Sequence, residues 1–215
     1  MFDLDGVLLD SEELHYRAYS EVLAAFGVVV GRQEYAEHWI AAGHGPEYAV
    51  ETYSLPVTPA ELRARKAPVY RRLLQAGLQP MPGAQLVLEQ LSREFALGIA
   101  TNSSRADVDW VLSQLGWQHF FEVVVGREDY REAKPAPDAY LTARSQLAVP
   151  PEHCLVVEDS PRGVLAARAA GLRAVAVPNE FTRVCTFPPG TELVEHLSDI
   201  TPSFVRLRLE RGGAA

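Results

Sequence analysis

The sequence predicts an α/β protein in which a parallel sheet is covered by helices on both faces and an all-helical segment is added to it. Two patterns predict this fold class. Between residues 84 and 177, helix-like segments alternate with short apolar runs, as is typical of parallel sheets covered on both faces. Between residues 14 and 80 no strand-like run occurs, so this part of the chain predicts helices only.

The first half of the chain predicts a strand end followed by helices. Apolar and acidic residues alternate between residues 2 and 9, and Gly6 marks a turn, so a strand should end here. Helical patterns follow over residues 11–26, 32–42, 46–53 and 58–76. Residues 58–61 have the spacing of a capping box with proline at the first helical position, and we expect Pro68 to kink or divide this last helix.

The second half predicts four helix-then-strand units. Helical patterns cover residues 84–94, 105–115, 138–147 and 161–170. The apolar runs that follow them cover residues 95–100, 121–125, 154–157 and 172–177. The tail is ambiguous, because Thr201-Pro202 is typical of a helix start while Val205, Leu207 and Leu209 alternate as in a strand.

Composition and charge exclude several classes of protein. The chain has 215 residues, a formal net charge of −8, 47% hydrophobic and 22% charged residues, all typical of a folded globular protein. No apolar run is long enough for a membrane span, and the acidic first residues are unlike a secretory signal. Two cysteines, Cys154 and Cys185, cannot form a disulfide framework, so we expect a reducing cytoplasm. The acidic balance argues against nucleic-acid and membrane partners.

Polar residues follow several of the predicted strands. In open parallel sheets, ligands bind beyond the carboxyl ends of the strands, so side chains at these ends should share one crevice. The residues concerned are Asp3, Asp5, Thr101, Asn102, Ser103, Lys134, Glu158 and Asp159. Four separate segments therefore supply hydrogen-bonding or ionisable groups to the same edge.

The carboxylates at this edge predict a metal site. Asp3 and Asp5 are two residues apart and repel each other unless a cation lies between them or one takes a proton. Such a pair suits a nucleophile and a proton-transfer group, although a strand end that caps a turn explains it as well. Glu158 and Asp159 add oxygen ligands of the kind Mg²⁺ prefers, or alternatively cap the next helix. Four carboxylates together would be strongly destabilising without a cation, which favours Mg²⁺.

The remaining residues at the edge predict a phosphate site. Thr101, Asn102 and Ser103 join a strand to a helix N-terminus, where free N–H groups and hydroxyls bind anions. The simpler alternative is an ordinary serine cap, which Ser104 provides. Lys134 lies in a proline-braced loop and is the natural counter-charge for the carboxylates, although a lone lysine there would be solvated.

Other candidates are weaker. The basic stretch of the long helix is interpreted as a solvated face or as a means of steering an anionic substrate; it comprises Arg63, Arg65, Lys66, Arg71 and Arg72. His44 lies between two glycines and is a candidate specificity contact. Cys154 falls in a predicted buried strand and should be inert. Five further histidines are scattered without metal-ligand spacing: His15, His38, His119, His153 and His196.

Together these residues resemble the haloacid dehalogenase superfamily of phosphotransferases over nearly the whole chain. Residues 2–8, FDLDGVL, look like its first motif, DxDGxL. Thr101, Lys134 in AKPAPD, and Glu158-Asp159 in VVEDSPRG match its second, third and fourth motifs in order. The branch that it resembles most contains phosphoglycolate phosphatases and β-phosphoglucomutases. The resemblance implies a Rossmann-like catalytic core, residues 1–13 and 81–215, and a helical cap, residues 14–80, inserted after the first strand.

The resemblance also implies roles for the acidic residues. Asp3 would be the nucleophile that forms an aspartyl-phosphate, and Asp5 would protonate the leaving alkoxide and then activate water. The metal ligands would come from Asp3, Asp5, Glu158 and Asp159: Asp5 would contribute its backbone carbonyl, and Glu158 would lie nearby or act through water.

The phosphoryl oxygens, by the same resemblance, would be held by Thr101, the backbone of Asn102, and Lys134, so that charge is neutralised during transfer. The cap would close over the site and exclude water from the wrong step.

Two departures from the family's pattern stand out. Only Met1 and Phe2 precede Asp3, so we expect either a short first strand or a start that lies further upstream. In the cap, residues 43–47, GHGPE, contain no arginine. The corresponding cap segment of the β-phosphoglucomutases that the chain resembles has an arginine, which grips a second phosphate. This absence favours a phosphatase over a mutase.

The function expected is that of a Mg²⁺-dependent phosphatase acting on a small phosphorylated metabolite, either a sugar phosphate or a short organic phosphate. The alternative is a β-phosphoglucomutase-like hexose-phosphate mutase. By the resemblance, a true dehalogenase would have a non-acidic residue in place of Asp5. A signalling receiver domain would be shorter than this chain and would lack the helical insertion. We expect a monomer or weak dimer with no nucleic-acid or membrane partner.

Overall fold

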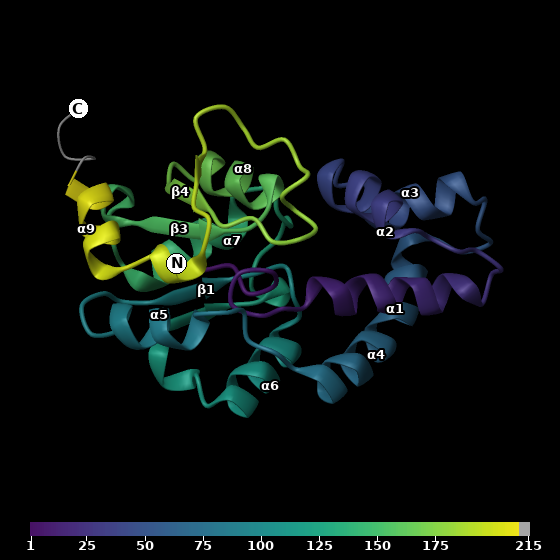
Figure 1. Cartoon of the computed structure of the whole chain (residues 1–215), viewed down its shortest axis with the longest axis horizontal. Coiled ribbons are helices and arrows are strands. Elements are labelled where there is room, and N and C mark those ends of the chain that lie inside the picture. Colours follow the sequence, from purple (N-terminus) through teal and green to yellow (C-terminus); the bar gives the residue numbers. More distant parts are fainter. Residues whose placement is uncertain (211–215) are drawn as a thin grey trace.

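The computed structural model describes residues 1–210, and Figure 1 shows an α/β core joined to a second, purely helical part. The strands of the core are β1 (Gly98–Ala100), β2 (Val123–Val125), β3 (Leu155–Glu158), β4 (Arg173–Ala176) and β5 (Glu192–Leu193). They pair in parallel, with β1 beside β2 and with β4 between β3 and β5. The predicted fold class, a parallel sheet with helices and an all-helical insertion, is confirmed.

The start of the chain joins the two groups of strands. Phe2 forms parallel bridges with Ile99 of β1 and with Val157 of β3. The amide of Phe2 donates to the carbonyl of Gly98 at 2.8 Å, and the amide of Asp3 donates to the carbonyl of Val157 at 3.0 Å. The chain start therefore lies between β1 and β3, and Asp3 leaves the sheet at its centre.

Alternate strand residues face two different layers of helices. Ile99 and Val157 belong to one apolar core, whereas Ala100 and Val156 belong to the other. The first core contains residues of α5 (Ala84–Leu91), α6 (Arg105–Leu115) and α9 (Pro202–Glu210), and the second those of α7 (Asp138–Leu147) and α8 (Pro161–Ala169). Figure 1 shows α5 and α6 below the sheet and α8 above it. Short 3₁₀ turns complete the core at Gln118–Phe120, Arg127–Asp129, Pro151–His153 and Leu197–Asp199.

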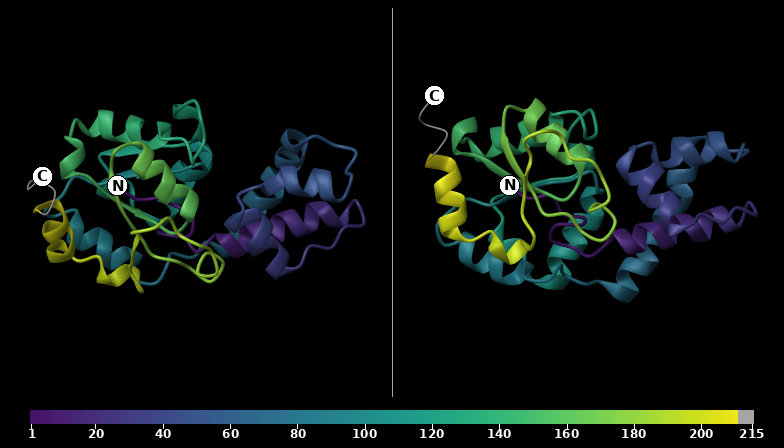
Figure 2. Two further views of the ribbon diagram at one scale, coloured as in Figure 1. Left: turned by 90° about the horizontal axis from the view of Figure 1, so that it is seen from above. Right: turned by 45° about the horizontal axis from the view of Figure 1, so that its top comes forward.

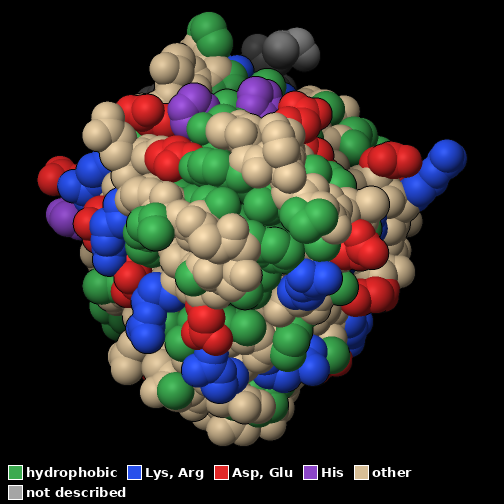
Figure 3. Space-filling view, turned by 90° about the vertical axis from the view of Figure 1, so that its right-hand side faces the viewer, with side chains coloured by type: hydrophobic (Ala, Val, Ile, Leu, Met, Phe, Trp, Pro, Cys, Tyr) green, Lys and Arg blue, Asp and Glu red, His purple; other side chains and the backbone are tan. Residues whose placement is uncertain are grey.

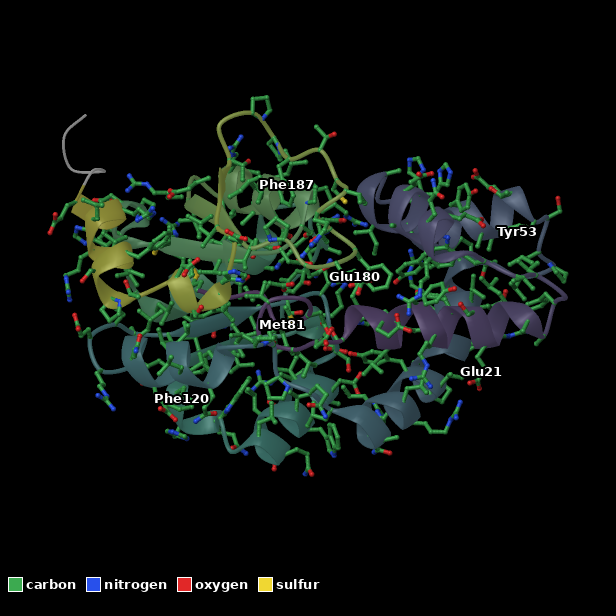
Figure 4. The ribbon with its side chains drawn as sticks, in the orientation of Figure 1. Glu21, Tyr53, Met81, Phe120, Glu180 and Phe187 are labelled. Carbon is green, nitrogen blue, oxygen red and sulfur yellow. The ribbon has the colours of Figure 1, made fainter. Side chains whose placement is uncertain are left out.

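The helical part has a core of its own. It consists of α1 (Glu12–Ala24), α2 (Arg32–Glu34), the π-helical η1 (Tyr35–Ala41), α3 (Gly45–Thr52) and α4 (Pro59–Gly77). Helix α1 packs against α4, and Leu23, Trp39 and Leu62 belong to one buried apolar cluster. Phe181, from the long loop after β4, packs into the same cluster. Figure 4 labels Glu180 in this loop, where it lies at the junction with the helical part.

Two adjacent chain segments connect the core to the helical part, as both views in Figure 2 show. Leu9 forms an antiparallel bridge with Pro80, and the amide of Asp10 donates to the carbonyl of Gln79 at 2.9 Å. The domain boundaries at residues 13/14 and 80/81 stay a prediction. Within the predicted core, residues 211–215 lie outside the described part of the chain.

Pro68 does not divide its helix, contrary to one of the two alternatives expected. Helix α4 begins at the capping box of Thr58 and Glu61 and continues through Pro68 to Gly77. A proline inside a helix costs about 3 kcal/mol. The same helix buries four large side chains, each worth ~1.5–3 kcal/mol; these are Leu62, Tyr70, Leu73 and Leu74. Because Pro68 and Ala64 are exposed, water can also hydrate the carbonyl that loses its partner.

The ambiguous tail is a helix rather than a strand. The hydroxyl of Thr201 accepts a hydrogen bond from the amide of Phe204 at 3.2 Å, and Pro202 occupies the first position of α9. Val205 is buried against the sheet, whereas Leu207 is exposed, so the alternating pattern does not reflect a buried strand face. Strand β5 was not predicted, because its two residues are both exposed and carry no periodic signal.

No helix within residues 1–210 combines the length and apolar character needed to span a membrane. Figure 3 views the end of the helical part, where Lys and Arg side chains are interspersed with Asp and Glu.

Candidate active site

A polar cavity of about 320 Å³ lies at the carboxyl ends of the central strands, facing the helical part. It is lined by most of the residues predicted for the site, namely Asp3, Asp5, Thr101, Asn102, Ser103, Lys134 and Asp159. Glu158 completes the predicted set from a fully buried position behind Lys134. The topology therefore brings all of these residues to one edge of the sheet.

Lys134 is a buried ammonium enclosed by acceptors. Its Nζ donates to Oδ1 of Asp3 at 2.9 Å, to Oε1 of Glu158 at 2.6 Å and to the hydroxyl of Tyr140 at 2.9 Å. Burial alone would lower the pKa of Lys134, but the charges of Asp3 and Glu158 outweigh it and hold the pKa above its ordinary value. Lys134 is thus a permanent cation at the site and not a solvated lysine.

Glu158 has hydrogen-bond donors at both carboxylate oxygens. Lys134 and Tyr140 donate to Oε1, while the hydroxyl of Ser160 and the amide of Asp159 donate to Oε2, each at 3.2 Å. A Cβ atom on Gly163, in the first turn of α8, would lie 1.8 Å from Cδ of Glu158. Glu158 is therefore fixed between Lys134 and the start of α8, and it holds the ammonium in place.

Three carboxylates form the acidic group of the site. One oxygen each from Asp3, Glu158 and Asp159 lies within 4.8 Å of the others. Burial, helped by the charge of the neighbouring Glu158, raises the pKa of Asp3 to about 7 against the opposing effect of Lys134. Burial, followed by repulsion from Glu158, also raises the pKa of Asp159 well above its ordinary value. Such buried, mutually repelling oxygens fit a hard divalent cation, which would relieve the repulsion.

Asp5 lies in a different environment from Asp3. Its carboxylate accepts hydrogen bonds from Ser11 at 2.5 Å, from Tyr70 at 3.2 Å and from Ser103, and it lies 3.4 Å from Nε2 of His15. Burial would raise the pKa of Asp5, but His15 and the hydroxyl donors outweigh it and lower the pKa well below its ordinary value. The two aspartates therefore lie in different environments, and their pKa values are displaced in opposite directions in the metal-free protein.

Four residues around Asp5 were not among the predicted site residues: Ser11, His15, Lys66 and Tyr70. The Nζ of Lys66 lies 2.5 Å from Nδ1 of His15, whose ring stacks on Tyr70 with centroids 4.1 Å apart. Burial lowers the pKa of Lys66 to about 8. The interpretation of the basic stretch as a solvated face fails for Lys66, although Arg71 and Arg72 are exposed and ion-paired on the surface.

A helical-spacing signal could have indicated these residues. Ser11 and His15 are four residues apart at the start of α1, and Lys66 and Tyr70 are four apart on α4, so each pair shares one helix face. The sequence does not show that the two faces meet over Asp5. That contact depends on the packing of α1 against α4.

The predicted phosphate segment stabilises the loops around the site. Thr101 is buried, and its hydroxyl accepts a hydrogen bond from the amide of Ser103 at 3.1 Å. The side-chain oxygen of Asn102 accepts from the amide of Lys134 at 3.1 Å and from the hydroxyl of Tyr130 at 2.7 Å. Asn102 thus ties the Lys134 loop to the first turn of the segment. Ser104 caps α6, as expected for that residue.

Comparisons with known proteins show the family and agree with the fold. Residues 1–177 match the haloacid dehalogenase-like hydrolase family. Among characterised relatives, the protein CbbY of Rhodobacter capsulatus is 34% identical, over 85% of this chain and 86% of its own length. Fructose-1-phosphate phosphatase YqaB of Escherichia coli is 32% identical, over 82% of this chain and 94% of its own length.

Solved structures include a variant of CbbY from Rhodobacter sphaeroides in complex with xylulose-(1,5)bisphosphate. That structure is 30% identical in sequence and has a TM-score of 0.78, and the match covers 92% of this chain and 93% of the other. A hydrolase from Entamoeba histolytica has a TM-score of 0.85 at 21% identity, which bears on the fold alone.

Proposed function

This chain belongs to the haloacid dehalogenase-like hydrolases and is an enzyme of their phosphatase type, and from this premise we propose that it is a Mg²⁺-dependent phosphatase acting through an aspartyl-phosphate. The observation that carries the proposal is the contrast between Asp3, held by Lys134, and Asp5, held by hydroxyl groups and His15. Two aspartates in such different environments suit a nucleophile and a proton-transfer group. The substrate class is a small phosphorylated metabolite, either a sugar phosphate or a short organic phosphate.

Asp3 is proposed as the nucleophile. Lys134 donates to its Oδ1, which orients the carboxylate so that Oδ2 can attack phosphorus in line with the leaving oxygen. A P–O bond to Asp3 forms as the bond to the substrate oxygen breaks, and water then hydrolyses the acyl phosphate. The ammonium of Lys134, together with N–H groups of residues 101–103, would hold the phosphoryl oxygens.

Asp5 is proposed as the proton-transfer residue. Its low pKa means that it is an anion in this arrangement, so it can take a proton directly from the attacking water in the second step. To protonate the leaving oxygen in the first step it must itself gain a proton; Nε2 of His15, 3.4 Å away, is placed to pass one to it while Nδ1 receives one from the ammonium of Lys66 at 2.5 Å. Hydrogen bonds from Ser11 and Ser103 keep the carboxylate directed during both steps.

The divalent cation is proposed to be Mg²⁺, held by Asp3, the backbone carbonyl of Asp5, and Asp159. Glu158 is part of the acidic group, but Lys134, Tyr140 and its other donors occupy its oxygens, so it contributes through Lys134 or through water. When bound, the cation supplies positive charge to the phosphate oxygens. We also propose that the helical cap (residues 14–80) closes over the site. The protein is further proposed to be cytoplasmic and to be a monomer or weak dimer.

The test is a screen of sugar phosphates and short organic phosphates in which free phosphate is measured with and without Mg²⁺. Asp3→Asn should abolish turnover, because the amide cannot attack phosphorus. Asp5→Asn should lower kcat by ~10²–10⁴-fold, the usual contribution of general acid–base catalysis. Asp10→Asn is the matched control, since Asp10 is an exposed aspartate nearby, and it should retain wild-type activity.

Full turnover by Asp3→Asn would contradict the proposal. Isomerised sugar phosphate without release of free phosphate would instead identify a hexose-phosphate mutase.

A further inference from the structure

The turn formed by residues 179–182, in the long loop after β4, contacts both parts of the molecule. Asn179 at its start donates to Asp159 in the candidate active site, whereas Phe181 packs into the core of the helical part. Glu180, which lies between them, is labelled at this junction in Figure 4. A short piece of chain therefore joins the acidic group of the site to the helical part.

Asn179 orients the carboxylate of Asp159. Its side-chain Nδ2 donates to Oδ2 of Asp159 at 2.7 Å. A Cβ atom on Gly6 would lie 2.6 Å from Nδ2 of Asn179 and closer still to Oδ2 of Asp159, so both groups pack directly against the backbone near the chain start. Because the bond to one oxygen fixes the plane of the carboxylate, the other oxygen is left in a defined position as a ligand for a cation.

The turn in its own structure fixes Asn179. The Oδ1 of Asn179 accepts hydrogen bonds from the amides of Phe181 at 2.9 Å and of Thr182 at 3.1 Å. The amide of Asn179 donates in return to the hydroxyl of Thr182 at 2.9 Å, and Thr182 is buried. Since the Asn179 side chain is bonded to the backbone of residue 181, a displacement of Phe181 moves the group that orients Asp159.

Phe181 is held by aromatic side chains of the helical part. It is 6% exposed, and its ring meets that of Tyr35 edge-on with centroids 5.8 Å apart. The ring of Tyr16 lies at 6.3 Å, and the guanidinium of Arg32 lies 5.7 Å from the Phe181 ring centroid. These partners belong to η1, α1 and α2. Phe181 therefore has its partners only while the helical part lies against the core as it does here.

The helical part is joined to the core by two adjacent chain segments, which pair where Leu9 bridges Pro80. Rotation about this connection would withdraw the aromatic partners from Phe181 and release the turn. Conversely, a cation on Asp159 would favour the position of Asn179 seen here and, through it, the docked position of Phe181. By thermodynamic linkage these two effects are equal in size.

We propose that the turn at residues 179–182 couples docking of the helical part to metal binding, with Asn179 as the positioning residue of Asp159. This inference rests on the proposed function, which assigns a divalent cation to Asp159. Docking of Phe181 orients Asp159 for the cation, and the bound cation stabilises the docked position of the helical part. The site therefore binds its cation most tightly when the helical part lies over it.

The test measures Mg²⁺ binding to the full chain by isothermal titration calorimetry, without substrate. Asn179→Leu has a side chain of similar size without a donor, so it should weaken Mg²⁺ binding about tenfold or more. Phe181→Ala keeps Asn179 and Asp159 and removes the contact with the helical part, so it should weaken binding about fivefold or more. Phe181→Leu loses the ring contacts but stays apolar, and it should give the same change if the alanine variant does not fold.

Phe120→Ala is the matched control. Phe120 is 8% exposed and packs in the core of the α/β part, in the 3₁₀ turn Gln118–Phe120. Its truncation should destabilise the protein as that of Phe181 does and keep the wild-type Mg²⁺ affinity. Equal affinity in the wild type, Asn179→Leu and Phe181→Ala would overturn the inference, as would an equal loss of affinity in Phe120→Ala or a wild type that binds no Mg²⁺.

Amide hydrogen exchange measures the same coupling from the other side. The amides of Phe181 and Thr182 donate to Asn179, so Mg²⁺ should slow their exchange about fivefold or more in the wild type and leave it unchanged in Asp159→Asn. Exchange that does not respond to Mg²⁺ in the wild type would reject the coupling, whatever the activity.

Both measurements are made without substrate, which separates this inference from the proposed function. If no phosphate monoester is hydrolysed but calorimetry and exchange behave as stated, the proposed function fails and the coupling stands. If monoesters are hydrolysed with Mg²⁺ but Phe181→Ala keeps the wild-type affinity, the coupling fails and the proposed function stands.

Discussion

Asp3 and Asp5 show how strongly the environment of a residue decides its chemistry. They are the same residue type, two positions apart, yet burial raises the pKa of one to about 7 while donors lower the pKa of the other. The sequence predicted both as site residues from their place after the first strand. It could not predict the difference, because the hydroxyls of Ser103 and Tyr70 that reach Asp5 lie 98 and 65 residues away.

Lys66 gives a prediction at the same scale. Burial lowers its pKa to about 8, so its ammonium is charged at neutral pH and loses its proton as the pH rises through about 8. Because Lys66 lines the substrate cavity, loss of this charge should raise KM for a phosphate monoester between pH 7 and pH 9. Lys66→Met should show a KM about tenfold higher at pH 7 and no such rise with pH, measured from steady-state kinetics.

Lys66→Arg is the control for this prediction. Its guanidinium stays charged throughout the range, so KM should remain low at pH 9. A wild-type KM that is constant from pH 7 to pH 9 would contradict the assignment.

At the scale of single elements, the junction of β3 with α8 fixes the geometry of the site. Glu158 ends β3, Ser160 caps α8, and Gly163 in the first helical turn lies directly against the Glu158 carboxylate. The sequence predicted the strand, the helix and the acidic pair. It gave no reason for a glycine at position 163, because that reason is a contact with a side chain of another element.

Gly163→Ala tests this junction. The added Cβ would lie 1.8 Å from Cδ of Glu158, so Glu158 or α8 must move. We expect the free energy of unfolding to fall by about 3 kcal/mol, as overpacking of a filled interior does, and kcat to fall because Lys134 loses its fixed partner. Urea unfolding and steady-state kinetics measure the two effects.

Gly77→Ala is the matched control, since a Cβ there has no atom within 4 Å. It should change stability by less than about 1 kcal/mol. Wild-type stability and activity in Gly163→Ala would show that Glu158 can be displaced without consequence.

Two elements show where local pattern is overridden. Of the two alternatives expected for Pro68, division of α4 is wrong: the helix is continuous, because one missing hydrogen bond costs less than the four buried side chains contribute. The tail residues from Val205 onward alternate like a strand, but Thr201 and Pro202 provide a helix start and a helix forms. In α4 the buried side chains outweigh the effect of the proline. In the tail the helix start at Thr201 and Pro202 outweighs the strand-like alternation.

At the scale of the whole molecule, the sheet brings carboxylates from the chain start and from β3 into one buried group. Asp3 and Asp159 bind protons more tightly in the folded state than in the unfolded chain, because their pKa values are raised from an ordinary value of 3.8. Between pH 3.8 and about 7 the folded state therefore holds more protons, so the stability of the metal-free protein should fall as pH rises through this window. The pKa of Asp5 is lowered, so its titration changes the stability only below pH 3.8.

Mg²⁺ should reverse this loss. At a concentration of ~100 Kd it should raise Tm at neutral pH by about 5–10 °C, because binding to the folded state alone adds ~2.7 kcal/mol. Thermal unfolding from pH 4 to pH 8, with and without Mg²⁺, measures both effects.

Asp159→Asn is the control for the metal effect. It should be more stable than the wild type in metal-free buffer at neutral pH, because it removes one buried repelling charge, and its Tm should not respond to Mg²⁺. A metal-free wild type whose stability rises with pH between 4 and 7 would contradict the raised pKa values.

The sequence by itself determined the order and type of most elements and the residues at the strand ends. Alternation in the strands, capping residues such as Thr58 and Ser104, and the position of Asp3 after the first strand are local signals that each segment carries alone. Only the tertiary structure decided that Lys66 reaches the site and that Arg162 lies against Gly43. Lys66 and its partner His15 are 51 positions apart in the sequence, and Arg162 and Gly43 are 119 apart. Both contacts depend on how the helices pack, which no short segment encodes.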